Sequence, residues 1–283
     1  MHKQTGQRQQ RVDASLVVRV LVASIVALFV LIPLVSTAIN GFKTNGQLML
    51  DPFGLPNPFI WSNYGGILSS PSFWRQMGNS VVVTVATVVV TVLVSSMAAF
   101  VLARYSFAGS RLTYNFFILG MLFPLTVATL PLYILLRQLG LIDSLWGVIL
   151  PQAAFGLPMN ILILRDYFRA IPVELEEAAA IDGCTALGFY WRVLTPLSRP
   201  ALAAVSMLAM VSSWNGFLLP LLVLNDDRLW TLPLGVMQFQ GQYSTNLALV
   251  MAFVTLSMLP AIVFYLFAER HLIAGLTAGS VKG

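Results

Sequence analysis

Long uncharged runs separate short charged segments along most of the chain. A helix needs about 20 apolar residues to cross the roughly 30 Å hydrocarbon core of a bilayer. The last run, 229–268, is polar in its first half, so only its second half has the composition of a span. Six segments then meet the length requirement: Val20–Phe42, Gln76–Ala103, Leu112–Leu136, Ser144–Leu164, Pro200–Asn225 and Leu247–Ala268. The pattern predicts an all-α integral membrane protein with six transmembrane helices.

Two other features of these runs need a separate interpretation. Pro52–Trp74 is also uncharged, but it contains four prolines. Irregular backbone cannot satisfy its hydrogen bonds in lipid, so this stretch is predicted to be a loop. Val35–Ala38 loosely resembles a signal-peptide cleavage site, but the preceding run is long for a signal peptide, and Pro33 also fits a helix end. We therefore expect the first span to be retained.

The distribution of Lys and Arg predicts the orientation. Cytoplasmic loops of membrane proteins are enriched in these residues. With the N-terminus inside, twelve fall in inner segments and four in outer ones; the inner set is Lys3, Arg8, Arg11, Arg19, Arg104, Arg111, Arg165, Arg169, Arg192, Arg199, Arg270 and Lys282, and the outer set is Lys43, Arg75, Arg137 and Arg228. Both termini are therefore predicted to be cytoplasmic.

This orientation divides the chain into four regions. They are a cytoplasmic N-terminal tail (1–19), the first transmembrane helix with an external loop (20–70), a transmembrane core (71–270) that contains a cytoplasmic loop (165–199), and a cytoplasmic C-terminal tail (271–283).

Composition agrees with a membrane protein. Of the 283 residues, 58% are hydrophobic and 10% are charged, against roughly 25% charged in an average soluble domain. This excludes a soluble globular or a disordered chain. The net charge of +5 is spread over loops rather than gathered in a patch, which argues against nucleic-acid binding. The single cysteine, Cys184, excludes an internal disulfide.

The residues that most catalytic and ion-coupled proteins need are missing from the predicted spans. None of the spans contains a charged residue, whereas proton- or ion-coupled carriers usually keep one as a relay. The two histidines, His2 and His271, lie near the ends of the chain, and no phosphate-binding loop is present. We expect no catalytic residue, metal or cofactor on this chain. Energy for uphill transport would have to come from a partner.

The inner loop 165–199 has the pattern of two short helices joined at a glycine. Pro172 suits a first helical position, three glutamates then fall in the first turns, and Gly183 is placed to end the helix. A second apolar stripe follows, closed by Thr195-Pro196; its residues are Ala186, Leu187, Tyr190, Val193 and Leu194. From these patterns alone, a knob that inserts into a partner's groove and a solvated loop with incidental helicity are equally supported.

This loop resembles the EAA loop of permeases from binding-protein-dependent ABC importers. The matching residues are Glu177-Ala178-Ala179, Gly183, Val193 and Pro196, at the family's spacing. Val193 replaces an isoleucine of the pattern and Thr195 replaces a leucine. The second change would loosen the packing of the second helix and leave the first intact.

The resemblance covers nearly the whole chain and points to the carbohydrate subfamily of maltose- and glycerol-phosphate-type permeases. It is carried by short strings in the family's order: Asn63-Tyr64, Asn79-Ser80, Ala98–Gly109, Leu139–Gly147, Leu150-Pro151, Trp214-Asn215, Thr231–Gly235 and Gly275–Gly283. It implies a type I ABC importer permease fold in a bacterial cell membrane. The implied partners are a second homologous permease, a dimer of ATPase subunits that hold ATP and Mg, and an extracytoplasmic solute-binding protein.

The resemblance also implies site residues. The expected ATPase-coupling residues are Glu174, Glu177, Ala178, Ala179, Asp182, Gly183 and Pro196. The tail 275–283 is either a frayed terminus or a further contact with the ATPase pair. The expected solute is a di- or oligosaccharide; a polyol, an amino sugar or glycerol 3-phosphate is the alternative, and a membrane scaffold or enzyme is the reading from another class.

Two further sets of polar residues remain open to two readings each. Asn160, Trp214 and Asn215 could line a sugar path, because sugars bind amides through their hydroxyls and aromatic rings through their C–H faces. Interhelical hydrogen bonding is the commoner role of a buried Asn. Gln238, Gln240 and Tyr243 lie in the outer loop 226–246 and either contact the binding protein or are simply solvated.

Overall fold

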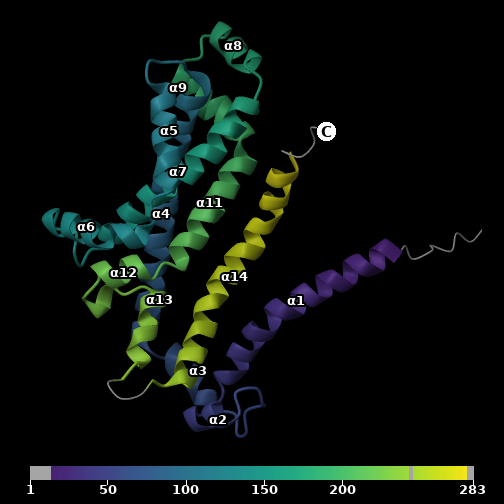
Figure 1. The fold of residues 1–283 in the computed structure, drawn as a ribbon, viewed down its shortest axis with the longest axis vertical. Coiled ribbons are helices and arrows are strands. Elements are labelled where there is room, and N and C mark those ends of the chain that lie inside the picture. The colour runs from purple at the N-terminus through teal and green to yellow at the C-terminus, as the bar shows by residue number, and fades with distance from the viewer. Residues whose placement is uncertain (1–13, 242–244, 279–283) are drawn as a thin grey trace, which may run out of the picture.

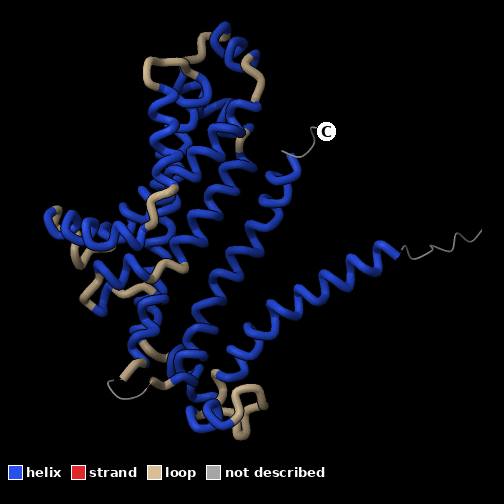
Figure 2. Tube along the Cα trace, in the orientation of Figure 1, coloured by secondary structure: helices blue, strands red, loops and turns tan. Residues whose placement is uncertain are grey.

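The computed structural model describes residues 14–241 and 245–278, and within them the chain is almost entirely helical (Figure 2). The only β-type pairing there is an isolated bridge between Gln240 and Thr245. The elements in chain order are α1 (Ala14–Asn40), α2 (Asn45–Leu50), α3 (Trp61–Leu68), α4 (Pro71–Arg104), α5 (Ser110–Met121), α6 (Leu125–Gln138), α7 (Trp146–Ala170), α8 (Glu174–Ile181), α9 (Ala186–Phe189), η1 (Tyr190–Leu194), α10 (Thr195–Leu197), α11 (Arg199–Trp214), α12 (Leu218–Val223), η2 (Asp227–Leu229), α13 (Leu232–Gly235), η3 (Val236–Phe239) and α14 (Leu247–Ala278).

Four helices in the described residues are long and apolar enough to cross a membrane without a break: α1, α4, α7 and α14. Two bent pairs raise the number to six if each pair counts as one span. The first pair is α5 with α6, at 104°, and the second is the segment 186–197 with α11, at 81°. The predicted number of six spans agrees with this upper count.

Two predicted spans are not continuous helices. The span predicted over Leu112–Leu136 breaks between α5 and α6, where Pro124 has no backbone N–H to continue the helical ladder and disfavours helical backbone at the preceding residue. The span predicted over Pro200–Asn225 ends as a helix at Trp214, and the chain turns through Gly216 before α12. A Cβ added to Gly216 would lie 2.6 Å from Nε2 of Gln152, so α7 leaves no room for a larger residue there.

Other boundaries also differ from the predicted ones. The stretch Pro52–Trp74 is not all loop, because it contains α3 and the start of α4. α1 begins at Ala14, inside the predicted N-terminal tail, and α14 continues to Ala278, inside the predicted C-terminal tail. The helices α1 and α14 continue through charged flanks that a hydropathy criterion excludes, whereas α3 fits between Pro58 and Pro71, which flank it without interrupting it.

The helices form an elongated bundle with two distinct ends (Figure 1). α8 and α9 lie at one end, which we call the α8 end, and α2 and α3 lie at the opposite end. The N-terminal end of α1 and the C-terminal end of α14 both extend toward the α8 end, while α6 projects sideways from the bundle. α1 packs against α14 near the α3 end and then diverges from it, so most of its apolar side chains are exposed.

α4 is the central helix, and α7 and α11 are its main neighbours. One face of α4 carries polar side chains that are buried along most of its length. They recur every three or four residues and therefore share one side of the helix. This α4 polar face consists of Gln76, Ser80, Thr84, Thr87, Thr91 and Ser95.

Candidate functional site

α8 has the local structure that its sequence predicts, with one shift at the start. The helix begins at Glu174, two residues after Pro172, and three glutamates occupy its first turn, where the helix dipole favours negative charge. It ends at Ile181, and Gly183 follows two residues later with a φ of 76°, in the left-handed region that glycine adopts without strain. The amide of Cys184 donates to the carbonyl of Ala179 at 2.8 Å and closes the helix end.

The second helix of the inner loop is longer than predicted. Thr185 caps its start by accepting a hydrogen bond from the amide of Gly188. Helical structure then runs from Ala186 through a π-helical turn, η1, to Leu197. The prediction that Thr195-Pro196 closes this helix is wrong: Pro196 lies in the first turn of α10, where a missing N–H is tolerated, and the chain bends at Ser198 instead.

Contacts from Arg104 and Tyr105 fix α8 to the end of α4. The Nε atom of Arg104 lies 3.7 Å from the carboxylate of Glu176, and the guanidinium donates to the carbonyl of Ile171 at 3.0 Å. The hydroxyl of Tyr105 lies 3.4 Å from the same carboxylate. Burial, and secondly the charge of Glu176, raise the pKa of Tyr105. Glu176 therefore faces the bundle and holds α8 in place.

Most of the predicted coupling residues, a set that does not include Glu176, are exposed. Ala179 is half-buried and packs against the core beneath α8, and the rest are exposed: Glu174, Glu177, Ala178, Asp182, Gly183 and Pro196. Ile181, which the sequence analysis did not single out, is 86% exposed at the end of α8, and Leu187 is 59% exposed just beyond it. An acidic surface with an apolar tip therefore projects from the α8 end. The sequence feature that could have revealed this tip is Ile181 itself, an isoleucine that lies away from the inner face of an acidic helix.

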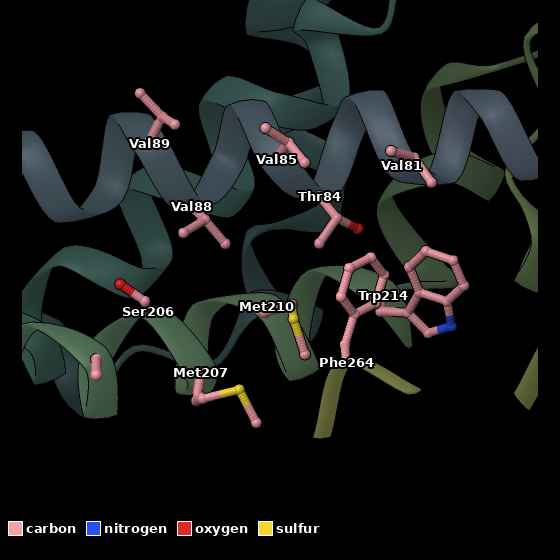
Figure 3. Close-up of a pocket in the computed structure, with 11 residues that line it drawn as sticks. Val81, Thr84, Val85, Val88, Val89, Ser206, Met207, Met210, Trp214 and Phe264 are labelled. Carbon is pink, nitrogen blue, oxygen red and sulfur yellow. The ribbon is translucent and has the colours of Figure 1, made fainter. Parts of the chain in front are cut away.

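The three predicted path residues do not come together. Asn160 on α7 is buried and lines a cavity of about 270 Å³ between α4, α7 and α11. Trp214 lies in a different, apolar cavity between α4, α11 and α14, beside Met210 and Phe264 (Figure 3), and its indole N–H donates to the carbonyl of Ser257 at 3.3 Å. Asn215 is exposed and its amide donates to Val211 of its own helix.

The Asn160 cavity contains polar residues that the sequence analysis missed. The Oε1 atom of Gln152 accepts hydrogen bonds from Thr87 at 3.2 Å and from Ser213 at 2.6 Å, so this amide joins α4, α7 and α11. Thr91 and Ser212 also line the cavity. The four-residue spacing of Thr87 and Thr91 was the available signal, because it places both hydroxyls on one helix face.

The outer loop 226–246 is attached to the helices at the α3 end. The Asn79 amide donates to the carbonyls of Arg228 and Trp230 at 2.9 and 3.0 Å. Gln238 lies 3.5 Å from the Ser72 hydroxyl and Gln240 forms the bridge with Thr245. Tyr243, the third predicted contact residue, lies outside the described residues.

Asp143 connects the α6–α7 loop to the segment after α12. Its carboxylate accepts from the backbone amides of Asp226 and Asn225. These hydrogen bonds, with that of Asp226 the larger cause, lower the pKa of the Asp143 carboxyl. Asp143 itself has a φ of 54°, a left-handed conformation that few non-glycine residues adopt.

Within the described part of the chain, no group of three or more His, Cys, Asp or Glu side chains is arranged to hold a metal ion.

Of the predicted C-terminal tail, residues 271–278 continue α14, and 279–283 lie outside the described residues.

Comparison with known proteins gives consistent matches over most of the chain. Residues 91–277 match the family of binding-protein-dependent transport system inner membrane components. The chain is 38% identical to the putative ABC transporter permease protein ORF2 of Caldicellulosiruptor sp. (strain Rt8B.4), over 89% of this chain and 92% of that protein. It is 34% identical to the arabinooligosaccharides transport system permease protein AraQ of Bacillus subtilis, over 91% and 92%.

Two solved structures share the fold. A chain of a bacterial ABC transporter involved in the import of alginate superposes with a TM-score of 0.78 at 24% identity, over 95% of this chain and 99% of that one. A chain of a bacterial alginate ABC transporter in complex with a pentasaccharide-bound periplasmic protein gives a TM-score of 0.64 at 14% identity, over 90% and 93%.

Proposed function

Because the chain belongs to the family of binding-protein-dependent transport system inner membrane components, we propose that it forms half of the translocation path of an ATP-driven oligosaccharide importer. The chain is a multi-pass protein of the bacterial cell membrane with the type I importer permease fold, and it is a transport subunit rather than an enzyme. The resemblance seen in the sequence to carbohydrate ABC importer permeases is thereby confirmed. What remains to propose is how the chain couples to its partners and which solute passes.

The observation that carries the coupling role is the exposed α8. This short acidic helix exposes most of its surface and an apolar tip, while Ala179, Arg104 and Tyr105 attach its inner side to the bundle. Such a helix suits insertion into a groove of another protein. We assign this groove to a dimer of ATPase subunits in the cytoplasm, where ATP and Mg would be bound. The predicted coupling residues Glu177, Gly183 and Pro196 belong to this contact.

This assignment places the α8 end in the cytoplasm and the α3 end outside. The Lys and Arg distribution supports the same orientation. The outer loop then faces an extracytoplasmic solute-binding protein, with Gln238, Gln240 and Tyr243 as contact residues. Attachment of this loop to α4 through Asn79 gives such a contact a fixed position.

The relatives support a di- or oligosaccharide as solute. Similar permeases serve arabinooligosaccharide transport in Bacillus subtilis and diacetylchitobiose uptake in Streptomyces coelicolor. The Asn160 cavity is lined by hydroxyl, amide and apolar groups. An uncharged sugar fits this lining better than glycerol 3-phosphate, whose phosphate would favour an Arg or Lys.

Co-purification tests the proposed function. The tagged chain, extracted in mild detergent from its host, should bring a second permease of the same family and an ATPase, and the purified binding protein should stimulate ATP hydrolysis. A panel of arabinotriose, diacetylchitobiose, maltotriose, sorbitol and glycerol 3-phosphate then identifies the solute class by uptake into proteoliposomes. Purification of the chain alone, or with an enzyme and no ATPase, would contradict an importer.

A further inference from the structure

The cavity around Asn160 is lined by residues of α4, α7 and α11. Its volume is about 270 Å³, close to the lower end of the roughly 300–1,000 Å³ of ligand pockets. The floor is polar and buried, with Thr87 and Thr91 from α4, Asn160 from α7 and Ser213 from α11. Phe155 and Met159 are exposed at the rim. The cavity therefore combines a polar interior with an apolar entrance.

Two floor atoms are buried without a hydrogen bond. Within the described residues, Oδ1 of Asn160 and Oγ1 of Thr91 have no partner, although the two residues are only 3% and 1% exposed. An unsatisfied buried polar group costs about 1–3 kcal/mol. A sugar hydroxyl, which both donates and accepts hydrogen bonds, is the kind of group that would satisfy such atoms if the side chains turned toward it.

Gly156 leaves space beside the side chains of Asn160 and Thr91. A Cβ added there would lie 3.7 Å from Nδ2 of Asn160 and 3.9 Å from Oγ1 of Thr91. A methyl group would thus occupy the position from which a ligand contacts both side chains. Nearby, Thr87 and Ser213 fix the amide of Gln152, so the neighbouring wall is preorganised.

The apolar cavity of Trp214 provides an internal comparison. It has a similar volume, about 300 Å³, but valine, methionine and aromatic side chains form most of its wall (Figure 3). Such a wall offers almost nothing to a hydroxyl group. The Trp214 cavity has the hydroxyls of Thr84 and Ser206 but no amide, whereas the Asn160 cavity combines two amides with several hydroxyls and the ring of Phe155, the groups that sugars bind.

We propose that the Asn160 cavity is a contact site for one uncharged sugar unit during passage, with Asn160 and Thr91 as its hydrogen-bonding groups and Phe155 at its entrance. This inference rests on the proposed function, because it assumes a sugar in transit. It assigns direct sugar contact to this permease and gives Gln152, Thr87 and Ser213 a positioning role.

Thiol accessibility tests the site without knowledge of the solute. Cys184 is the only cysteine, so Cys184→Ser gives a cysteine-free background. In this background, Ser212→Cys places a thiol at the Asn160 cavity. Ser206→Cys, on the same helix but in the apolar cavity, is the control. The assembled transporter in nanodiscs is treated with a charged methanethiosulfonate. The Ser212→Cys variant should react at rates that differ several-fold between the ADP and the ATP–vanadate states, and the Ser206→Cys variant should stay unreactive. A Ser212→Cys thiol that is unreactive in every state would overturn the proposal, because the cavity would then be closed to water throughout the cycle.

Transport by cavity variants tests the sugar contact itself. With arabinotriose and diacetylchitobiose as probes, Asn160→Ala and Gly156→Ala should lower uptake per ATP hydrolysed about tenfold, the equivalent of one hydrogen bond of about 1.4 kcal/mol. Ser206→Ala should leave uptake unchanged. Wild-type uptake by both cavity variants would overturn the inference while the importer function stands. A wild-type complex without binding-protein-stimulated ATPase would contradict the function instead, and the labelling result would remain decisive for the cavity.

Discussion

The phenol hydroxyl of Tyr190 and the hydroxyl of Ser96 lie 2.7 Å apart and form a buried hydrogen bond between η1 and α4. The Tyr190 ring also packs at 5.3 Å from the ring of Phe100 on α4. Because a close-packed core transmits strain, we expect these contacts to pass a displacement of α8 and α9 to the central helix α4.

We expect Tyr190→Phe to destabilise the protein by about 1 kcal/mol, the net value of a hydrogen bond. Uptake per ATP hydrolysed should fall as well, because η1 loses a fixed link to α4. Thermal unfolding and proteoliposome uptake measure the two effects. Ser96→Ala and the double variant complete a cycle: if the two hydroxyls act as a pair, the double variant is little worse than either single one, and strictly additive effects would contradict the link.

Ile181→Asp should reduce co-purification of the ATPase without unfolding the permease. The side chain is 86% exposed, so substitution should change the free energy of unfolding by less than about 0.5 kcal/mol. Asp166→Asn, an exposed change at the same end of the molecule, is the matched control. Equal ATPase recovery from both variants would show that the tip of α8 takes no part in docking.

Gly183→Val should uncouple transport from ATP hydrolysis. The φ of 76° costs a side-chain-bearing residue about 1–2 kcal/mol, and a β-branched one more. Gly183→Asn is the informative comparison, because Asn tolerates the left-handed region. Uptake measured beside ATPase activity should be low for Val and close to wild type for Asn. A similar loss in both would indicate a need for space rather than for backbone conformation.

Glu177→Lys, on the exposed face of α8, should also uncouple transport from ATP hydrolysis, as measured by the same pair of assays.

Asp143 should make stability depend on acidic pH. Its carboxyl has a pKa below the ordinary value of 3.8. The stabilisation is therefore complete above about pH 4 and lost as pH falls through the lower, folded-state pKa. Asp143→Asn retains a residue that tolerates a φ of 54° but removes the charge. The Tm of the variant should be lower than that of the wild type at neutral pH, and it should change less between pH values above and below 4. Parallel plots of Tm against pH for the two proteins would refute the role of the charge.

Surface labelling should confirm the orientation. Cys184 follows α8 and should resist a membrane-impermeant maleimide in intact cells, then react after permeabilisation. In a Cys184→Ser background, Gln238→Cys should react without permeabilisation. External labelling of Cys184 would reverse the assigned topology.

The sequence predicted the unbroken helices well because a long uncharged run needs only length and composition to be recognised. α1, α4, α7 and α14 all correspond to such runs. The breaks at Pro124 and Gly216 depend on geometry as well as residue type, since Pro131, Pro151, Pro158 and Pro260 all lie inside helices. Proline alone therefore does not reveal where a span bends.

For the candidate sites, local pattern served better than residue type. The glycine at the end of α8 was predictable because the requirement for a left-handed residue is local. Trp214 and Asn215 were grouped with Asn160 on chemistry, but tertiary packing separates them into a different cavity and an exposed helix end. Thr87 and Thr91 were overlooked because the search for path residues relied on amides, charges and aromatic rings, and a threonine in an apolar helix has none of these.

The α4 polar face has a consequence for how the protein enters the membrane. Its serines and threonines lie in a helix whose mean hydropathy reaches 2.5, so the segment inserts as an ordinary apolar one. While the helix is alone in lipid, each hydroxyl can donate a hydrogen bond to a carbonyl of its own helix, as the Ser95 hydroxyl does to the carbonyl of Val92 in the folded chain. After folding, the same hydroxyl can rotate toward a neighbour or a passing molecule. Such a face is apolar enough for insertion, because its hydroxyls bond within the helix. The same hydroxyls become available for polar contacts after folding through rotation about χ1.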